Sequence, residues 1–157
     1  MPDTDQFELM LLRHSYEAFG MVIDLLSRNL PFAKFEVGDL GAAVRLQLQL
    51  EHHVGAISEG KLIGYLGWLN TSPTVAEAWV AGKGPLTTES SGNSAALTIV
   101  VGTDSKVIRA LISNARQRNE GKRVYFKRAA GQGTERKTSV LNRGGRSDQQ
   151  KDNVALK

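Results

Sequence analysis

Three histidines and the absence of cysteine limit the chemistry available to this chain of 157 residues. His52 and His53 are adjacent and His14 stands apart from them, so no H-x-x-x-H or H-E-x-x-H spacing is available for zinc. Without cysteine there is no thiolate nucleophile and no disulfide. We therefore expect no metal site. An imidazole is the only side chain that could move a proton near neutral pH without a shifted pKa.

Ser27 is a further residue with chemical potential, in the stretch "SRNLP" at 27–31. A serine near the end of a helix commonly bonds to nearby backbone, and its hydroxyl needs a neighbouring base to become a nucleophile. No G-x-S-x-G turn, Walker loop or G-x-G-x-x-G fingerprint is present. Of the histidines, we expect His14 to be packed, whereas one of His52 and His53 is available to line a cleft.

The first half of the chain must supply the elements that position these residues. Apolar residues at three- and four-residue steps predict a helix over residues 6–29, which ends before Pro31. A short helix is expected from Asp39 to Val44. The alternation in "RLQLQLEHHVGAI" then predicts a strand with both histidines at its end, and "KLIGYLGWLN" predicts a central strand that is apolar on both faces.

The second half predicts further helices and strands in alternation. "SPTVAEAWVAG" should form a helix capped by Ser72, "SAALTIVVG" a buried strand, "TDSKVIRALISNARQRNEG" a helix capped by Asp104 or Ser105, and "KRVYFKRA" a last strand. The whole predicts one α+β, α/β-like domain over residues 1–128 with helices packed on a mixed sheet. Residues 129–157 contain few large apolar side chains and are expected to be a disordered basic tail.

The net charge of +4 is concentrated in one segment. Eight basic residues and only one acidic residue lie between Lys106 and Arg128. This segment predicts a positive surface for an acidic partner, although a solvated helix face is the plain alternative. Nucleic acid is a less favoured partner because no known nucleic-acid module matches. No signal peptide and no membrane span is recognised, so a soluble cytoplasmic protein is expected.

Several fragments taken together resemble the RTX toxin-activating lysine acyltransferases, the hemolysin C family, whose fold is related to the GNAT acetyltransferases. The similar stretches are "SRNLPF" at 27–32, the segment 37–72, "AEAWVAGKGPL" at 76–86, and "AALTIVVG" with the following helix and "GKRVYFKR". They cover about residues 10–128. The resemblance implies a GNAT-related mixed sheet.

The resemblance also implies an activity. Members of this family transfer a fatty acyl group from acyl carrier protein to a lysine of an RTX-type toxin, without a metal or a tightly bound cofactor. An aspartate and a histidine assist proton removal from the attacking amine, as the chemistry requires. The positive surface predicted above would suit an acidic carrier protein.

The chain departs from the family at the residues that matter most. Ser27 stands where the family has histidine, and Thr98 stands where it has aspartate. The flanking positions agree, and they suggest substrate contacts for Arg28, Asn29, Trp68 and Asn70. His52 or His53 would have to replace the missing imidazole. Two hypotheses follow: an acyltransferase with an altered site, or a non-catalytic member that still binds an acidic carrier or partner protein.

Overall fold

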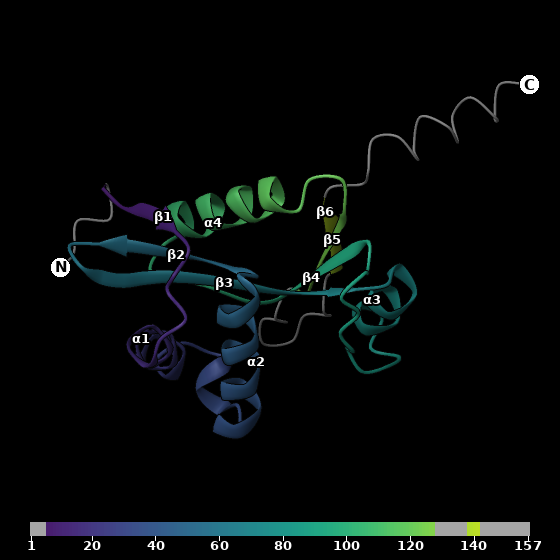
Figure 1. The fold of residues 1–157 in the computed structure, drawn as a ribbon, viewed down its shortest axis with the longest axis horizontal. Helices are drawn as coiled ribbons and strands as arrows, with labels where there is room; N and C mark the ends of the chain where they lie inside the picture. The colour runs from purple at the N-terminus through teal and green to yellow at the C-terminus, as the bar shows by residue number, and fades with distance from the viewer. Residues whose placement is uncertain (1–5, 128–137, 142–157) are drawn as a thin grey trace, which may run out of the picture. The chain divides into compact units, whose positions relative to one another are not determined.

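The computed structural model describes residues 6–127 and 138–141 (Figure 1). Its elements, in chain order, are β1 (Glu8–Met10), α1 (Tyr16–Ser27), the 3-10 helix η1 (Phe32–Lys34), α2 (Val37–Leu50), β2 (His53–Ser58), β3 (Lys61–Thr71), α3 (Pro73–Val80), β4 (Ser94–Gly102), α4 (Ser105–Arg118), β5 (Arg123–Lys127) and β6 (Thr138–Leu141). None of the helices in this described part is long and apolar enough to cross a membrane.

The strands form one mixed sheet in the order β1-β2-β3-β4-β5-β6. Neighbours β1 and β2, β2 and β3, and β5 and β6 are antiparallel, whereas β4 and β5 are parallel. Gly67 lies against Thr98 and Gly64 lies against Val101, so β3 and β4 also run in opposite directions. The predicted α+β architecture with a mixed sheet is confirmed.

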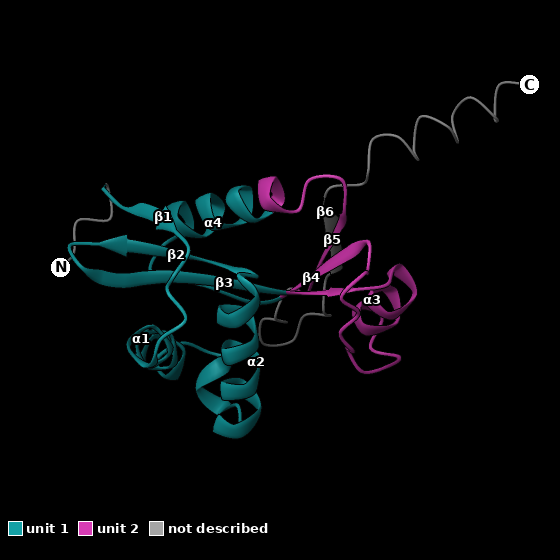
Figure 2. Ribbon diagram, viewed as in Figure 1, with its two compact units in different colours: residues 1–68, 98–115 teal, residues 69–97, 116–157 magenta. Residues whose placement is uncertain are grey.

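Contacts divide the chain into two compact units (Figure 2). Unit 1 comprises residues 1–68 and 98–115, and unit 2 comprises residues 69–97 and 116–157. In unit 1, α1 and α2 lie on one face of β2 and β3, and α4 lies on the other (Figure 1). Gly64 on β3 allows the close approach of α4, because a Cβ there would lie 2.7 Å from a methyl group of Val107.

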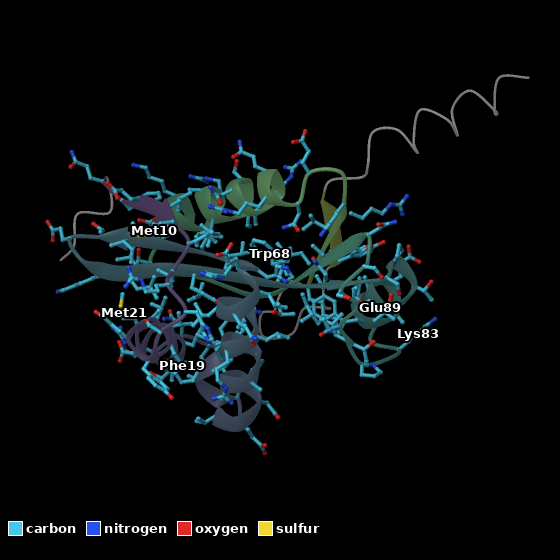
Figure 3. The ribbon with its side chains drawn as sticks, in the orientation of Figure 1. Met10, Phe19, Met21, Trp68, Lys83 and Glu89 are labelled. Atoms are coloured by element: carbon cyan, nitrogen blue, oxygen red, sulfur yellow. The ribbon has the colours of Figure 1, made fainter. Side chains whose placement is uncertain are left out.

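Unit 2 is built on α3 and β5. The Tyr125 hydroxyl donates a hydrogen bond to Glu77 Oε1 at 3.2 Å, and the Lys127 ammonium lies 4.6 Å from the centre of the Trp79 ring. The loop that contains Lys83 and Glu89 (Figure 3) is tied to the end of β3, because the Glu89 N–H donates to the carbonyl of Asn70 at 2.9 Å. Trp79 itself is half-buried, and its ring contacts the Lys127 ammonium within this unit.

The predicted helix over residues 6–29 is wrong in its first half. Residues Glu8–Met10 form β1, and α1 begins only at Tyr16. Ser15 is its N-cap, since the Ser15 hydroxyl accepts from the Ala18 N–H at 3.1 Å. His14 consequently precedes the helix and is exposed, instead of packing on its apolar face.

The strand predicted from "RLQLQLEHHVGAI" is also wrong over most of its length. Residues Val37–Leu50 form α2, which extends the predicted short helix by two turns, and β2 begins at His53. Leucine, glutamine and arginine are good helix formers, and the segment 45–50 contains no β-branched residue to favour a strand. Burial follows the helical spacing of Leu40, Val44 and Leu48.

The other predicted elements are confirmed, with Ser72 capping α3 and Asp104 capping α4. The predicted tail at 129–157 lies outside the described residues except for β6, which pairs with β5.

Candidate functional site

The corner formed by residues 27–29 is occupied by local hydrogen bonds. The Ser27 hydroxyl donates to the carbonyl of Asp24 at 2.7 Å, and the amide of Asn29 donates to the carbonyl of Leu25 at 2.7 Å. Arg28 forms an exposed ion pair with the Asp24 carboxylate at 2.7 Å. These side chains complete the last turn of α1. In the described part of the chain, no imidazole is a hydrogen-bond partner of the Ser27 hydroxyl.

Thr98, the second residue at a predicted catalytic position, belongs to a different cluster. Its hydroxyl accepts a hydrogen bond from Gln47 Nε2 at 2.8 Å and donates to the carbonyl of Gly67 at 3.4 Å. Gln47 comes from the last turns of α2, and only 2% of its surface is exposed. Thr98 itself is half-buried, so that part of it remains accessible.

Tyr65 on β3 completes this cluster. Its hydroxyl donates to Gln47 Oε1 at 2.9 Å, and the phenol is fully buried. Burial raises the pKa of Tyr65 above its ordinary value of 10.0, so the phenol keeps its proton and remains a donor. The order of donation is therefore from Tyr65 to Gln47 to Thr98, and each amide atom of Gln47 has a partner.

Gly67 makes room for the amide of Gln47. A side chain at position 67 would overlap the amide oxygen and Cδ of Gln47. The amide of Gln47 thus packs directly against the backbone of β3 at Gly67. We name Gln47, Tyr65, Gly67 and Thr98 the Gln47 cluster.

The sequence interpretation missed Gln47 because the alternating leucines placed it on the polar side of a strand. In a helix, Gln47 falls on the same face as Leu40 and Val44, both of which are buried. If the segment is read as a helix, a glutamine on its apolar face indicates a buried polar side chain that needs hydrogen-bond partners.

His53 is a structural residue in this arrangement. Its Nε2 accepts from the Leu12 N–H at 2.9 Å, and its Nδ1 lies 2.9 Å from the carbonyl of Gln47, to which it donates. The ring is therefore the neutral tautomer with its proton on Nδ1. Both nitrogens are engaged with backbone in a fully buried position.

His52 is only half-buried and stacks on Trp68, with ring centres 5.9 Å apart. Asn70 lies two residues farther along β3 and is buried. The structure therefore groups the predicted residues as His52 with Trp68, and His53 and Thr98 with Gln47. It joins none of them to Ser27 by a hydrogen bond within the described residues.

On the side of β4 that faces β5, residues 98–102 have no strand partner among the described residues, and we call this stretch the open edge of β4. Its pairing with β5 runs from Ser94↔Arg123 to Leu97↔Phe126, and no described strand pairs with this edge over residues 98–102. Backbone N–H and C=O groups on such an edge can bind an extended chain. Thr98 is the first residue of this open stretch.

The amino end of α4 follows this edge directly. Asp104 Oδ1 accepts from the Val107 N–H at 2.9 Å, which places a carboxylate at the positive end of the helix dipole. No group of three or more His, Cys, Asp or Glu side chains in the described residues could hold a metal ion.

Comparison with known proteins gives the fold. The sequence matches no protein-family model and no curated protein. The loading GNATL domain of CurA from Lyngbya majuscula superimposes with a TM-score of 0.62 at 16% identity, covering 82% of this chain and 67% of that domain. The GphF GNAT-like decarboxylase in complex with isobutyryl-CoA has a TM-score of 0.61 at 14% identity, with 79% of this chain and 67% of that one covered.

A third similar structure is the ribosomal-protein-S18-alanine N-acetyltransferase from Escherichia coli. Its TM-score is 0.55 at 10% identity, over 82% of this chain and 70% of the enzyme. The chain therefore has the GNAT-like fold, as the resemblance implied.

Proposed function

We propose that this chain is an acyltransferase that takes a fatty acyl group from acyl carrier protein and transfers it to a lysine of an acceptor protein, with an RTX-type toxin as the acceptor class. The observation that carries the proposal is the stretch of β4 beyond Leu97, which lacks a strand partner on its β5 side within residues 6–127 and 138–141, in a GNAT-like fold. A phosphopantetheine arm is an extended chain with amide groups. An unpaired strand edge is suited to hydrogen-bond such an arm and to present its thioester at Thr98.

Two features support a carrier protein over coenzyme A as the donor. The similar GphF structure contains isobutyryl-CoA, but in this chain the Asp104 carboxylate already occupies the amino end of α4. A nucleotide diphosphate at that helix end would be repelled more strongly than the single phosphodiester of a carrier-bound arm. Four of the exposed side chains of α4 are basic and would attract an acidic carrier protein: Lys106, Arg109, Arg116 and Arg118.

His52 is the candidate general base in this proposal. Both ring nitrogens of His53 are bound to backbone, and the Ser27 hydroxyl is bound to its own helix. His52 is half-buried against Trp68, so it combines partial exposure with a fixed ring plane. The substrate contacts expected of Arg28 and Asn29 would require their local bonds to Asp24 and Leu25 to open.

A second candidate function is favoured by the residues at the two family positions. Ser27 and Thr98 are both neutral hydroxyls, and neither has a titratable hydrogen-bond partner within the described residues. A protein that binds acyl-loaded carrier protein, or another acidic partner, without transferring the acyl group would need no titratable partner at either position. We therefore keep a non-catalytic carrier-binding protein as the alternative.

An acylation assay distinguishes the two functions. The protein is incubated with fatty acyl carrier protein and a candidate toxin, and lysine acylation is followed by mass spectrometry. The enzyme hypothesis expects transfer that His52→Gln abolishes and that His14→Gln, at an exposed histidine, leaves unchanged. Ser27→Ala should also leave transfer unchanged, because the Ser27 hydroxyl is bound to its own helix. Carrier binding without transfer would establish the alternative, and the absence of both would overturn the two proposals.

A further inference from the structure

The Gln47 cluster places two large polar side chains in the interior of unit 1, where apolar side chains are usual. A buried amide and a buried phenol are costly to desolvate, and an apolar pair would fill the same volume without a missing side chain at position 67. The hydrogen bonds all lead in one direction, from Tyr65 through Gln47 to the hydroxyl of Thr98. Thr98 is also the cluster's only member that is not fully buried.

The orientation of the Thr98 hydroxyl follows from this order. Gln47 Nε2 donates to the oxygen, so the Thr98 proton must point to a different acceptor. The acceptor in the structure is the carbonyl of Gly67, and the 3.4 Å between the two oxygens is long compared with the usual ~2.7 Å for such a bond. The proton is thus weakly engaged. Gly67 lies on the β3 side of Thr98, so a stronger acceptor at the open edge, on the β5 side, would capture the proton after a rotation of the O–H.

We infer that the Thr98 hydroxyl donates a hydrogen bond to the carbonyl oxygen of the bound acyl thioester, and that Gln47 is the positioning residue that orients it. This inference rests on the proposed function, in which the chain binds an acyl carrier protein loaded with an acyl group. It makes Thr98 a neutral donor, which differs from the carboxylate that the toxin-activating family has at this position.

The role of such a donor can be stated for the transfer step. The lysine nitrogen attacks the thioester carbon, and the carbonyl electron pair moves to the oxygen, which becomes negatively charged. The Thr98 O–H stabilises this oxyanion without giving up its proton. The carbon–sulfur bond then breaks, the sulfur leaves on the carrier arm and takes up the proton lost by the amine, and an amide remains on the lysine.

The test uses acyl carrier protein charged with an octanoyl group that is ¹³C-labelled at the thioester carbonyl. Difference infrared spectra of the complex report the carbonyl stretch, which shifts to lower frequency when the oxygen accepts a hydrogen bond. We expect the lowered frequency with the wild-type protein and with Thr98→Ser, and the frequency of the free thioester with Thr98→Val. Thr103→Val, at an exposed threonine after β4, is the matched control.

The positioning role of Gln47 is tested in the same complex. Gln47→Met should raise the carbonyl frequency toward the free value although Thr98 is intact, whereas Gln49→Met, at an exposed glutamine of the same helix, should not. If transfer is active, Thr98→Val should lower kcat by about 100-fold with little change in KM, and Thr98→Ser should restore most of the rate.

The outcomes separate the inference from the proposed function. Failure of the charged carrier protein to bind would overturn the proposed function and this inference with it. Binding with the same carbonyl frequency in wild type and Thr98→Val would overturn the inference alone. Thermal unfolding of each variant establishes that a changed spectrum does not come from a loss of fold.

Discussion

Gly67 is constrained by its neighbour and not by its own backbone conformation. Its φ angle is not in the left-handed region, yet a methyl group there would overlap the amide of Gln47. The requirement is reciprocal, because the amide of Gln47 can reach Tyr65 and Thr98 only across a residue without a side chain. Two residues 20 positions apart in the sequence thus behave as one unit.

The substitution Gly67→Ala should therefore destabilise the protein by about 3 kcal/mol, the upper end of the usual cost of overpacking. Chemical denaturation would measure this loss. Gly20→Ala is the control, since nothing lies within 4 Å of a Cβ there and alanine in the middle of α1 should stabilise by about 0.5–1 kcal/mol. If Gln47→Ala does not recover part of the loss in the double variant, the overlap with Gln47 is not the cause.

Tyr65 should make the stability of the protein depend on pH in the alkaline range. Burial raises its pKa in the folded state above the ordinary value of 10.0, so above that pH the unfolded chain loses a proton that the folded chain keeps. The contribution of Tyr65 is complete below pH 10.0 and is lost as the pH rises, with a slope of about 1.4 kcal/mol per pH unit.

This slope can be measured as the free energy of unfolding from neutral to alkaline pH. Tyr65→Phe should flatten the alkaline decline, whereas Tyr16→Phe should not, because Tyr16 is 97% exposed. Equal slopes in wild type and Tyr65→Phe would contradict the assignment.

At the scale of elements, α2 shows where sequence reasoning failed and why. The alternation of Leu46, Leu48 and Leu50 is compatible with a strand, but Leu50 is exposed and Leu48 is buried beside Val44, which is the helical pattern. Six alternating residues were too few to distinguish the two periods, and the helix propensity of the segment decided the outcome. This error also affected the prediction of the site, because a strand would place Gln47 on its polar face, whereas the helix buries it.

The amino end of α4 was predicted more closely, since Asp104 or Ser105 was expected as its cap. The structure selects Asp104. Asp104→Ala should cost about 1 kcal/mol of unfolding free energy, and Asp104→Asn should retain most of it because the amide oxygen can still accept from Val107. Ser105→Ala should change the stability by less than about 0.5 kcal/mol. An equal loss from Ser105→Ala would refute the assignment of the cap.

At the scale of the whole molecule, the GNAT-like sheet was predictable, and the grouping of site residues was not. Glycine-containing β3, the buried β4 and the amphipathic α4 carry strong local patterns, and these gave the order of the second half correctly. The Gln47 cluster depends on contacts such as Gln47 with Thr98, 51 positions apart, which no local pattern records. Of the four residues in the Gln47 cluster, the sequence drew attention only to Thr98, and the catalytic position assigned to it stays a prediction.

The distribution of charge gives a prediction at the same scale. If an acidic carrier protein approaches α4, the double variant Lys106→Glu, Arg109→Glu should weaken its binding by about tenfold. Rising salt should weaken wild-type binding and affect the variant less. Lys61→Glu, at an exposed lysine that begins β3, is the control for a change of charge elsewhere on unit 1. If the loss of binding free energy per reversed charge is the same for Lys61→Glu as for the double variant, the carrier protein does not dock on α4.

The imidazole of His53 joins two segments at very different distances along the chain. Its bond to the Leu12 N–H spans 41 positions, whereas its bond to the Gln47 carbonyl spans six. Short-range contacts close early in folding and long-range contacts close later. The segment that carries β1 should thus dock last and leave first, so loss of the imidazole should speed unfolding more than it slows folding. Hydrogen exchange at the Leu12 amide would show this opening as an event that precedes global unfolding.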